Sequence, residues 1–170
     1  MVEHAIYFGK NSFYELIRSV GGQWNDSKER PIVCLLKLSE NDKLYWAIPI
    51  GNYNHRDINA QKRLKKYLEY KNDDIRSCFY HIGKTDVTSI FFISDAVPIT
   101  DEYIEREYIG KYSQTHYIIK NKQTIYELER KLKRILSWEN AKPNYFRQHI
   151  TDIKNYLISE SKSQDKEQDA

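Results

Sequence analysis

Two apolar runs joined by a polar turn restrict the folding of this chain more than any other feature. Residues 32–38 and 44–50 are apolar or β-branched almost throughout, and turn-forming residues separate them, so we expect an antiparallel hairpin with a longer loop. Pro49 lacks a backbone N–H to donate to a neighbouring strand, and we expect the second strand to end or bulge there. The polar loop that follows, with His55 and Arg56, would then be displayed beyond a rigid sheet.

Helical spacing flanks this hairpin. Ser12 and Glu15 have capping-box spacing at the start of one helix, which Gly21–Gly22 would end. Asp57 can cap a second helix that runs to about Tyr70. The residues expected to face the core from these helices and from two later ones are Phe13, Leu16, Ile17, Val20, Ile58, Leu64, Leu68, Ile118, Ile125, Leu128, Leu132, Ile135, Phe146, Ile150, Ile153 and Leu157.

The second half of the chain continues with strands and then helices. Residues 77–82 and 87–94 predict a second hairpin, and Thr100 can cap a short helix. Longer apolar stripes predict helices over about 114–137 and after Pro143. The order αββαββααα indicates an α+β fold, in which helices wrap a small, curled antiparallel sheet.

Composition bounds the domain organisation and the cellular setting. We expect one domain over residues 1–158, with 14% aromatic residues in the whole chain to build a core, and a polar, disordered tail over 159–170. No apolar run approaches the roughly 20 residues of a membrane helix, and Met1 leads into no signal sequence. We therefore expect a cytoplasmic protein without a membrane partner. Cys34 and Cys78 have no CxxC partner and are expected to be reduced, buried thiols.

The sequence lacks the motifs of metal and nucleotide chemistry. The five histidines form no HExxH or His-x-His pair, and the carboxylates form no ligand cluster beyond Asp73 and Asp74. There is also no P-loop, no GxGxxG and no GxSxG motif, so nucleotide hydrolysis, dinucleotide redox chemistry and α/β-hydrolase chemistry lose their usual signatures. We therefore expect no metal site and no cofactor.

The residues that are left suit the attack of an RNA 2′-hydroxyl on its neighbouring phosphate. This reaction needs a base, cations or N–H donors for the charge on phosphorus, and an acid for the departing 5′-oxygen. His55 and Arg56 can fill these roles, and His81 is the next candidate. The alternatives are a solvated loop before a helix for His55 and Arg56, and a hydrogen-bonded core histidine for His81, which lies in an apolar run.

Basic and aromatic residues provide candidate contacts to an RNA strand. A net charge of +3 is only mildly basic, so the position of the charges matters more than their sum. A basic cluster lies on the outer side of the second predicted helix, although such clusters are most often solvated helix faces. Tyrosines offer faces on which unpaired bases stack, although most tyrosines serve in packing. The candidates on these grounds are Asn52, Tyr53, Lys62, Arg63, Lys65, Lys66 and Lys84.

Three segments between Arg30 and Leu136 read, in order, RPIVCLLKLSENDKLYWAIPIG, HIGKTDVTSIFFISDAVPIT and THYIIKNKQTIYELERKLKRIL. Together they resemble the toxins of type III toxin–antitoxin systems, the ToxN/AbiQ-like superfamily. The second segment is most similar to the CptN and TenpN branches. The resemblance covers most of the chain and rests on the order of several short motifs, none of them an invariant catalytic signature.

The resemblance implies a fold, an activity and a partner. The fold would be a compact, strongly curved antiparallel sheet surrounded by helices, akin to the barrel of the Kid/MazF toxins. The activity would be a metal-independent endoribonuclease that cuts single-stranded RNA, including cellular mRNA, and leaves a 2′,3′-cyclic phosphate and a 5′-hydroxyl. The antitoxin would be a small pseudoknot-type RNA, cut by the toxin from tandem repeats and bound in a cyclic protein–RNA assembly, as in phage defence by abortive infection.

The chain departs from the family pattern after the second predicted strand. The pattern Pro-Leu-Thr/Ser-Ser-Pro-Lys supplies a hydroxyl and a lysine, whereas this chain reads PIGNYNHR at that place. Because the lysine is absent, His55 or Arg56 would have to supply the positive charge. By resemblance, Arg30 matches a basic position just before the first strand of the hairpin, while Tyr117 and Lys122 fall where the family brings a helix to the RNA groove.

Two other classes of function stay open on the sequence. One is an RNA-binding module without catalysis, in which the same basic groove sequesters a structured RNA. The other is a protein-interaction domain that docks through its last helices. Short tandem repeats followed by a terminator directly upstream of the gene would favour the toxin.

Overall fold

The computed structural model describes residues 1–24, 30–38 and 41–168, and all the strand pairs within them are antiparallel. A seven-stranded sheet has the order β4-β5-β3-β2-β1-β7, and β6 pairs with β3 outside this path. In the described residues the edge strands β4 and β7 do not pair, so the α+β class is confirmed but the sheet is not closed into a barrel. The elements are β1 (Ile6–Gly9), α1 (Asn11–Ser19), β2 (Ile32–Leu38), β3 (Asn41–Asn52), α2 (Ile58–Leu68), η1 (Ile75–Cys78), β4 (Tyr80–Lys84), β5 (Thr88–Phe92), η2 (Ile93–Asp95), β6 (Val97–Ile99), η3 (Asp101–Tyr103), β7 (Ile104–Glu107), α3 (Lys122–Ala141) and α4 (Ile150–Gln168), where η marks a 3₁₀ helix.

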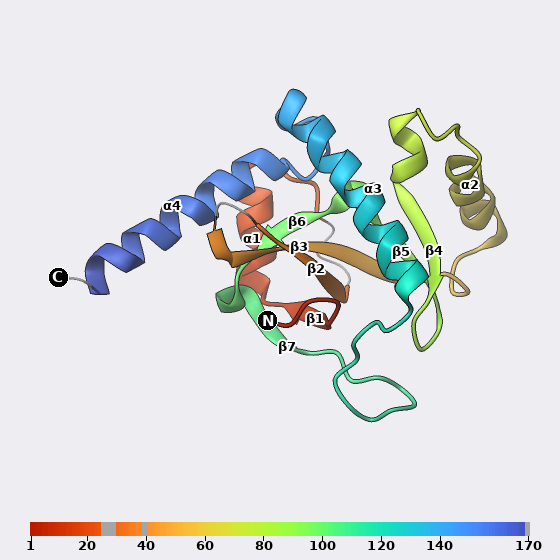
Figure 1. Ribbon diagram of the computed structural model, residues 1–170, viewed down its shortest axis with the longest axis horizontal. Coiled ribbons are helices and arrows are strands. Elements are labelled where there is room, and N and C mark those ends of the chain that lie inside the picture. Colours follow the sequence, from red (N-terminus) through yellow and green to blue (C-terminus); the bar gives the residue numbers. More distant parts are fainter. Residues whose placement is uncertain (25–29, 39–40, 169–170) are drawn as a thin grey trace.

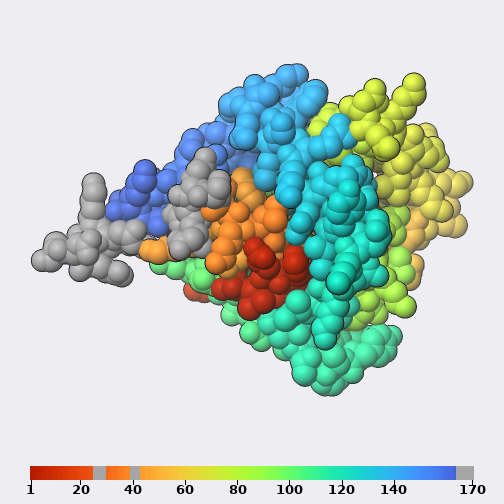
Figure 2. Space-filling model, viewed as in Figure 1, coloured from red at the N-terminus to blue at the C-terminus, as the bar shows by residue number. Residues whose placement is uncertain are grey.

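Helices surround the sheet (Figure 1). Helix α3 crosses one face of the sheet, α2 lies beside β4 at one end, and α4 extends from the body at the other end. In the space-filling view, α3 and the segment 108–121 form much of the surface that faces the viewer (Figure 2). None of the helices in the described residues is long and apolar enough to cross a membrane.

The predicted first hairpin is confirmed as β2 and β3, and these two strands lie at the centre of the sheet. Strand β3 nevertheless continues through Pro49 to Asn52, so the expected end or bulge at the proline is wrong. The N–H of Ile50 donates to the carbonyl of Pro31 on the β2 side at 2.8 Å, and successive N–H groups of a strand point to opposite sides. The missing N–H of Pro49 therefore faces the gap where β3 has left β6, after Ala47, and not yet joined β5. The proline removes no ladder hydrogen bond there.

Two strands that the sequence did not predict, β1 and β7, extend the sheet on the β2 side. Strand β1 pairs with both β2 and β7. Ile118 pairs with Ala5 in an isolated bridge, so the helix expected from about residue 114 begins only at Lys122, as α3. The second hairpin is confirmed as β4 and β5, but residues 77–78 belong to η1, which precedes it.

The two N-terminal helices differ in detail from the prediction. Helix α1 begins before Ser12 and has no side-chain capping hydrogen bond, so the capping box of Ser12 and Glu15 does not form. Helix α2 is capped as predicted, because Asp57 Oδ1 accepts the N–H at the third residue of the helix at 2.8 Å. Ile58 and Leu68 of α2 were expected in the core and are instead 70% and 37% exposed.

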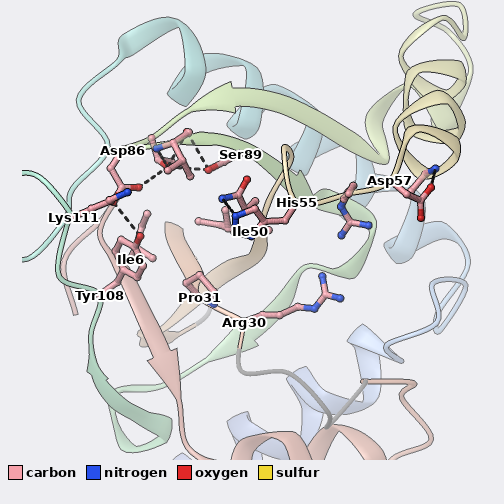
Figure 3. A pocket seen from close by; sticks show the side chains of 16 residues that line it. Ile6, Arg30, Pro31, Ile50, His55, Asp57, Asp86, Ser89, Tyr108 and Lys111 are labelled. Carbon is pink, nitrogen blue, oxygen red and sulfur yellow. Dashed lines mark hydrogen bonds between the residues drawn. The ribbon is translucent and has the colours of Figure 1, made fainter.

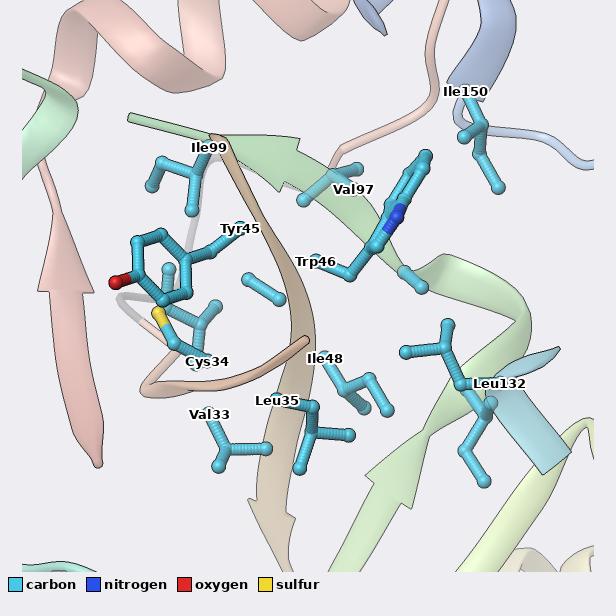
Figure 4. Close-up of a cluster of buried hydrophobic side chains, with 14 of the residues drawn as sticks. Val33, Cys34, Leu35, Tyr45, Trp46, Ile48, Val97, Ile99, Leu132 and Ile150 are labelled. Carbon is cyan, nitrogen blue, oxygen red and sulfur yellow. The ribbon is translucent and has the colours of Figure 1, made fainter. Parts of the chain in front are cut away.

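The main core lies between the central strands and the two long helices (Figure 4). Leu35 and Ile48 of the hairpin and Leu132 of α3 are fully buried in it. Cys34 and Cys78 are free and buried, as expected, although Cys78 lies in η1 and not in a strand. Burial raises the pKa of the Cys34 thiol to about 12, which keeps it protonated at neutral pH.

The last helix begins later and ends later than the apolar pattern suggested. Phe146 is buried in the segment before α4, which starts at Ile150 and continues to residue 168. Residues 159–168 of the expected tail are therefore helical. The hydroxyl of Tyr103 donates to the carboxylate of Glu160 at 3.2 Å, so this part of α4 is held to the body of the domain.

Candidate functional site

A cleft of about 740 Å³ lies where the end of β3 and the start of β5 approach the start of α2 (Figure 3). Strand β3 contributes Asn52, and the loop after it contributes His55 and Arg56. Arg30 enters from the segment that leads into β2. The cleft thus brings together four of the predicted site residues, and the opposite wall is formed by residues from the β4–β5 hairpin and the segment after β7, namely Thr85, Asp86, Ser89, Tyr108 and Lys111.

Two arginines form the positively charged wall of the cleft. The guanidinium carbons of Arg30 and Arg56 lie 5.0 and 4.9 Å from the ring centroid of Phe92, so both make cation–π contacts with the same ring. Burial, and then the charge of Arg56, lowers the pKa of Arg30. The Nε of Arg56 is buried without a partner, and within the described residues neither guanidinium has an ion-pair partner. Two like charges on one wall favour the binding of an anion such as a phosphate, although the charge of Asp95 partly offsets that of Arg30.

Asn52 orients the ring of His55. Its Oδ1 accepts the backbone N–H of Asn54 at 3.0 Å, which directs the Nδ2 toward the Nε2 of His55 at 3.4 Å. Because an amide nitrogen only donates, His55 accepts this hydrogen bond, and its Nε2 carries a lone pair. His55 is exposed at the cleft, so a bound hydroxyl group can reach that lone pair.

Asp86 organises the opposite wall. Its carboxylate accepts hydrogen bonds from the Tyr108 hydroxyl and the Lys111 backbone N–H, both at 3.0 Å, and from the Thr85 hydroxyl at 3.2 Å. The hydroxyls of Thr85 and Ser89 lie 2.8 Å apart. Burial, and then the hydrogen bond to Asp86, raises the pKa of Tyr108 to about 12, so its hydroxyl is protonated at neutral pH. This wall can hydrogen-bond to sugar or phosphate oxygens.

His81 lies outside the cleft. It is half-buried on β4, its ring centroid is 6.1 Å from that of the fully buried Phe91, and α3 packs against this strand. Burial, and then the charge of Lys131 in α3, lowers the pKa of His81 to about 4, so the ring is neutral at pH 7. Its surroundings are those of a packed histidine, the alternative considered for it from the sequence.

A second hollow, of about 370 Å³, adjoins the cleft because Thr85 lines both. Lys84 and Tyr117, two of the predicted RNA contacts, line this hollow together with Lys120. Lys122 is exposed at the start of α3, immediately after the residues that line the hollow. Basic residues therefore line both of these neighbouring hollows.

The remaining predicted RNA contacts lie apart from the cleft. Tyr53 packs against Leu64 and Ile90 in a small second core, and its hydroxyl is buried without a partner. The basic residues of α2 are all exposed, and none of them lines the cleft; they are Lys62, Arg63, Lys65 and Lys66.

The Asp86 wall was missed by sequence reasoning. Thr85 and Asp86 were visible only as turn residues of the second hairpin, and nothing marked their side chains as functional. Tyr108 and Lys111 reach the cleft because β7 pairs with β1, and neither strand was predicted. Tyr108 and Lys111 could have been placed at the cleft only if β1 and β7 had been predicted as paired strands.

Within the described residues, no three or more His, Cys, Asp or Glu side chains are grouped so that they could hold a metal ion. The cleft is lined by guanidinium, imidazole and hydroxyl groups and by the two carboxylates of Asp57 and Asp86. No protein-family model matches the chain, and no curated protein sequence matches it either. The function of the cleft is therefore inferred from its own chemistry.

Proposed function

We propose that the cleft is the active site of a metal-independent endoribonuclease that cuts single-stranded RNA. The observation that carries the proposal is the pairing of Arg30 and Arg56 over Phe92, in the same cleft as His55. Guanidinium groups bind phosphate oxygens through paired N–H donors, and an imidazole nitrogen with a lone pair accepts a proton. These are the groups that attack by a 2′-hydroxyl requires.

In the proposed reaction, the 2′-oxygen bonds to the adjacent phosphorus while the bond from phosphorus to the 5′-oxygen breaks. The Nε2 of His55 takes the 2′-hydroxyl proton, in place of its hydrogen bond from Asn52. Arg30 and Arg56 stabilise the negative charge that develops on the phosphate oxygens. The departing 5′-oxygen takes up a proton supplied by water or a hydroxyl of the Asp86 wall, which leaves a 2′,3′-cyclic phosphate and a 5′-hydroxyl.

The surface beside the cleft supports an RNA strand as the substrate. The adjoining hollow places Lys84, Lys120 and Tyr117 next to Thr85, where cations can contact phosphates and an aromatic ring can contact a base. The exposed basic residues of α2 begin a few residues after Arg56 but lie apart from the cleft, so they contact only a strand that extends beyond it. A strand that crosses the cleft would meet positive charge at the arginine pair and in the adjoining hollow.

The sequence resemblance supports a more specific assignment, the toxin of a type III toxin–antitoxin system. Its partner would be a small repeat RNA that the toxin cuts and that then occupies the same groove, and its target would be cellular mRNA in the cytoplasm. On this assignment, the open antiparallel sheet corresponds to the strongly curved sheet of the Kid/MazF-like toxins.

The proposed activity is tested with purified protein and a mixed RNA pool in excess EDTA. We expect cleavage to survive the chelator, and the products to carry 2′,3′-cyclic phosphate and 5′-hydroxyl ends. A substrate with deoxyribose at the cut position should bind but stay intact, because the nucleophile is missing. Cleavage that needs Mg²⁺ or Mn²⁺ would refute the mechanism, and binding without any cleavage would indicate a non-catalytic RNA-binding module instead.

A further inference from the structure

One aromatic ring contacts both arginines of the cleft. Arg30 precedes β2 and Arg56 follows β3, and both lie in irregular segments of the chain. Their guanidinium carbons lie over the ring of Phe92, 5.0 and 4.9 Å from its centroid. Among the described residues, no side-chain hydrogen bond or ion pair holds either guanidinium, and the Nε of Arg56 is buried without a partner. The contact with Phe92 is therefore the described interaction that the two side chains share.

The Phe92 ring is itself held firmly by its neighbours. Phe92 is the last residue of β5, is 7% exposed, and packs with Leu64 and Ile90 in the small second core. The ring of Tyr80 meets it edge to face, with the centroids 6.0 Å apart and the planes at 83°. Tyr80 is supported in the same way by Tyr67 of α2, at 5.0 Å and 79°. A ring enclosed on these sides stays in place when a side chain at its surface moves.

Gly51 on the neighbouring strand β3 leaves room for this arrangement. A Cβ at Gly51 would lie 3.1 Å from the Cε2 of Phe92 and 3.5 Å from the Nη2 of Arg56. The first distance is shorter than an ordinary contact between carbon atoms, so the ring would have to shift. Gly51 does not have a positive φ, so its backbone conformation is open to any residue. The close approach of the ring and the guanidinium is therefore the structural reason for a glycine here.

The electrostatics of the ring face suit two cations that repel each other. Arginine side chains are long and flexible, so two of them with like charge move apart unless another group holds both. The face of an aromatic ring carries partial negative charge and attracts a guanidinium. Asp95 partly offsets the charge of Arg30, but its carboxylate already accepts two hydrogen bonds from Arg147. The ring of Phe92 can therefore keep Arg30 and Arg56 together on one wall of the cleft.

We infer that Phe92 is a positioning residue of the cleft, whose ring face holds Arg30 and Arg56 in place for the phosphate that reacts. The inference rests on the proposed function, because it takes that phosphate to belong to an RNA strand. Phe92 acts through the two arginines and does not itself contact the substrate. Its role depends on the negative charge of the ring face and not only on the shape of the ring. A ring of nearly the same shape with a weaker negative face should therefore support a slower reaction.

The test replaces Phe92 by phenylalanines that carry one, two or three fluorine atoms on the ring. Each fluorine withdraws charge from the ring face, while the side chain keeps nearly the same shape and stays apolar. We expect the rate of RNA cleavage to fall with each fluorine, and the trifluorinated protein to be about threefold to thirtyfold slower, the range that cation–π contacts supply. A ring that served only in packing would not give this graded loss. Circular dichroism and urea unfolding show that each protein is folded.

Two matched controls separate the ring face from general disturbance. The same fluorinated series at Phe8, where Arg106 lies 3.8 Å from the ring centroid, should leave cleavage unchanged. Gly51→Ala should slow cleavage about tenfold or more, because it displaces the ring and small displacements of reacting groups are costly. Gly83→Ala places a Cβ 3.2 Å from the Cε2 of Phe91, a ring that does not line the cleft, and should have little effect on the rate.

A second measurement does not depend on cleavage. Inorganic phosphate is titrated into the protein, and NMR follows the Nε–H signals of Arg30 and Arg56. We expect both signals to shift, and the affinity for phosphate to fall as fluorine is added to Phe92. A graded loss in either measurement that the Phe8 series lacks supports the inference. A trifluorinated protein that stays within about twofold of the wild type in both measurements would overturn it, because that change is smaller than a cation–π contact supplies. Phosphate that shifts neither signal would overturn it as well.

The two failures are distinguishable. If phosphate affinity depends on the Phe92 ring but RNA is never cut, the proposed function fails and the positioning role stands. If RNA is cut at a rate that fluorine at Phe92 does not change, the proposed function stands and the positioning role fails.

Discussion

Replacing either arginine of the cleft by methionine should cost little stability, while it removes most of the proposed activity. Both guanidinium carbons lie within 5.0 Å of the Phe92 centroid, so they are at most about 10 Å apart. At that separation, two unit charges repel by about 0.4 kcal/mol in water and about 1.7 kcal/mol at an effective dielectric constant of 20. Each substitution of Arg30 or Arg56 relieves this repulsion but loses a cation–π contact, which contributes about 0.5–1 kcal/mol. We therefore expect each single change to alter the free energy of unfolding by less than about 1 kcal/mol.

The double variant isolates the repulsion itself. Arg30→Met and Arg56→Met each remove the same repulsive interaction, so the double variant can gain it only once. The change in the free energy of unfolding of the double variant should differ from the sum of the two single changes by about 0.5–1.5 kcal/mol, which is the repulsion counted twice in that sum. This difference should shrink in 1 M salt. Urea unfolding followed by circular dichroism measures these values. Arg106→Met is the matched control, because Arg106 lies 3.8 Å from the Phe8 centroid, away from this arginine pair.

The cleavage rate, unlike the stability, should fall strongly. Loss of one group that stabilises the phosphate charge typically lowers the rate about a hundredfold to a thousandfold, so both single variants should cut RNA at least about a hundredfold more slowly. Additive losses of more than about 2 kcal/mol in unfolding free energy, together with unchanged cleavage, would refute the reasoning. The arginines would then be structural groups that pack on Phe92, and the cleft would not be the phosphate site.

Three further predictions concern other residues. Expression of the protein without its cognate RNA should arrest bacterial growth, and His55→Ala should relieve the arrest and slow cleavage by about a hundredfold or more in a protein that still folds, as judged by circular dichroism. His81→Asn should leave cleavage intact and should change the pH dependence of stability. Between pH 6.5 and about 4 the unfolded chain binds a proton that folded His81 does not, so wild-type stability should fall as the pH falls through this window. The variant should lose that part of the pH dependence. Replacing Lys62 and Lys66 by Gln should reduce the slope of log affinity against log salt by roughly 0.7 per lost phosphate contact and change stability by less than about 0.5 kcal/mol, whereas an unchanged slope would make this a solvated helix face.

The elements with strong periodicity were predictable from the sequence, and the short ones were not. Apolar runs indicate the β2–β3 hairpin, and the Asp57 cap indicates the start of α2. Strand β7 has the sequence IERE, which carries no apolar alternation; among the described strands it is an edge strand that pairs with β1 alone. The spacing of Ile118 matches the apolar stripe of α3, but the residue pairs with Ala5 in a β-bridge and is not part of the helix. The local spacing of apolar residues does not predict a contact between residues so far apart in the chain.

The same distinction divides the candidate site. Arg30, His55 and Arg56 flank the one hairpin that the sequence specified clearly, so their convergence could be anticipated. Asp86 and Tyr108 meet at 3.0 Å only through the pairing of two unpredicted strands, and no property of either residue revealed this. The lysines of α2 were proposed as RNA contacts because they are close together in the sequence. What distinguishes the cleft is that side chains from several elements meet there, and not a high density of charge in one segment.

One local rule of protein stability is broken in the cleft. Arg30 and Arg56 hold like charges beside one ring, without an ion-pair partner among the described residues. The repulsion between them opposes folding, and substitution of either by an apolar residue would relieve it. A chain that served only as a scaffold would have no reason to keep this pair on the wall of a cleft. A ligand that carries an anion offsets the repulsion, and a phosphate within an RNA strand is such a group.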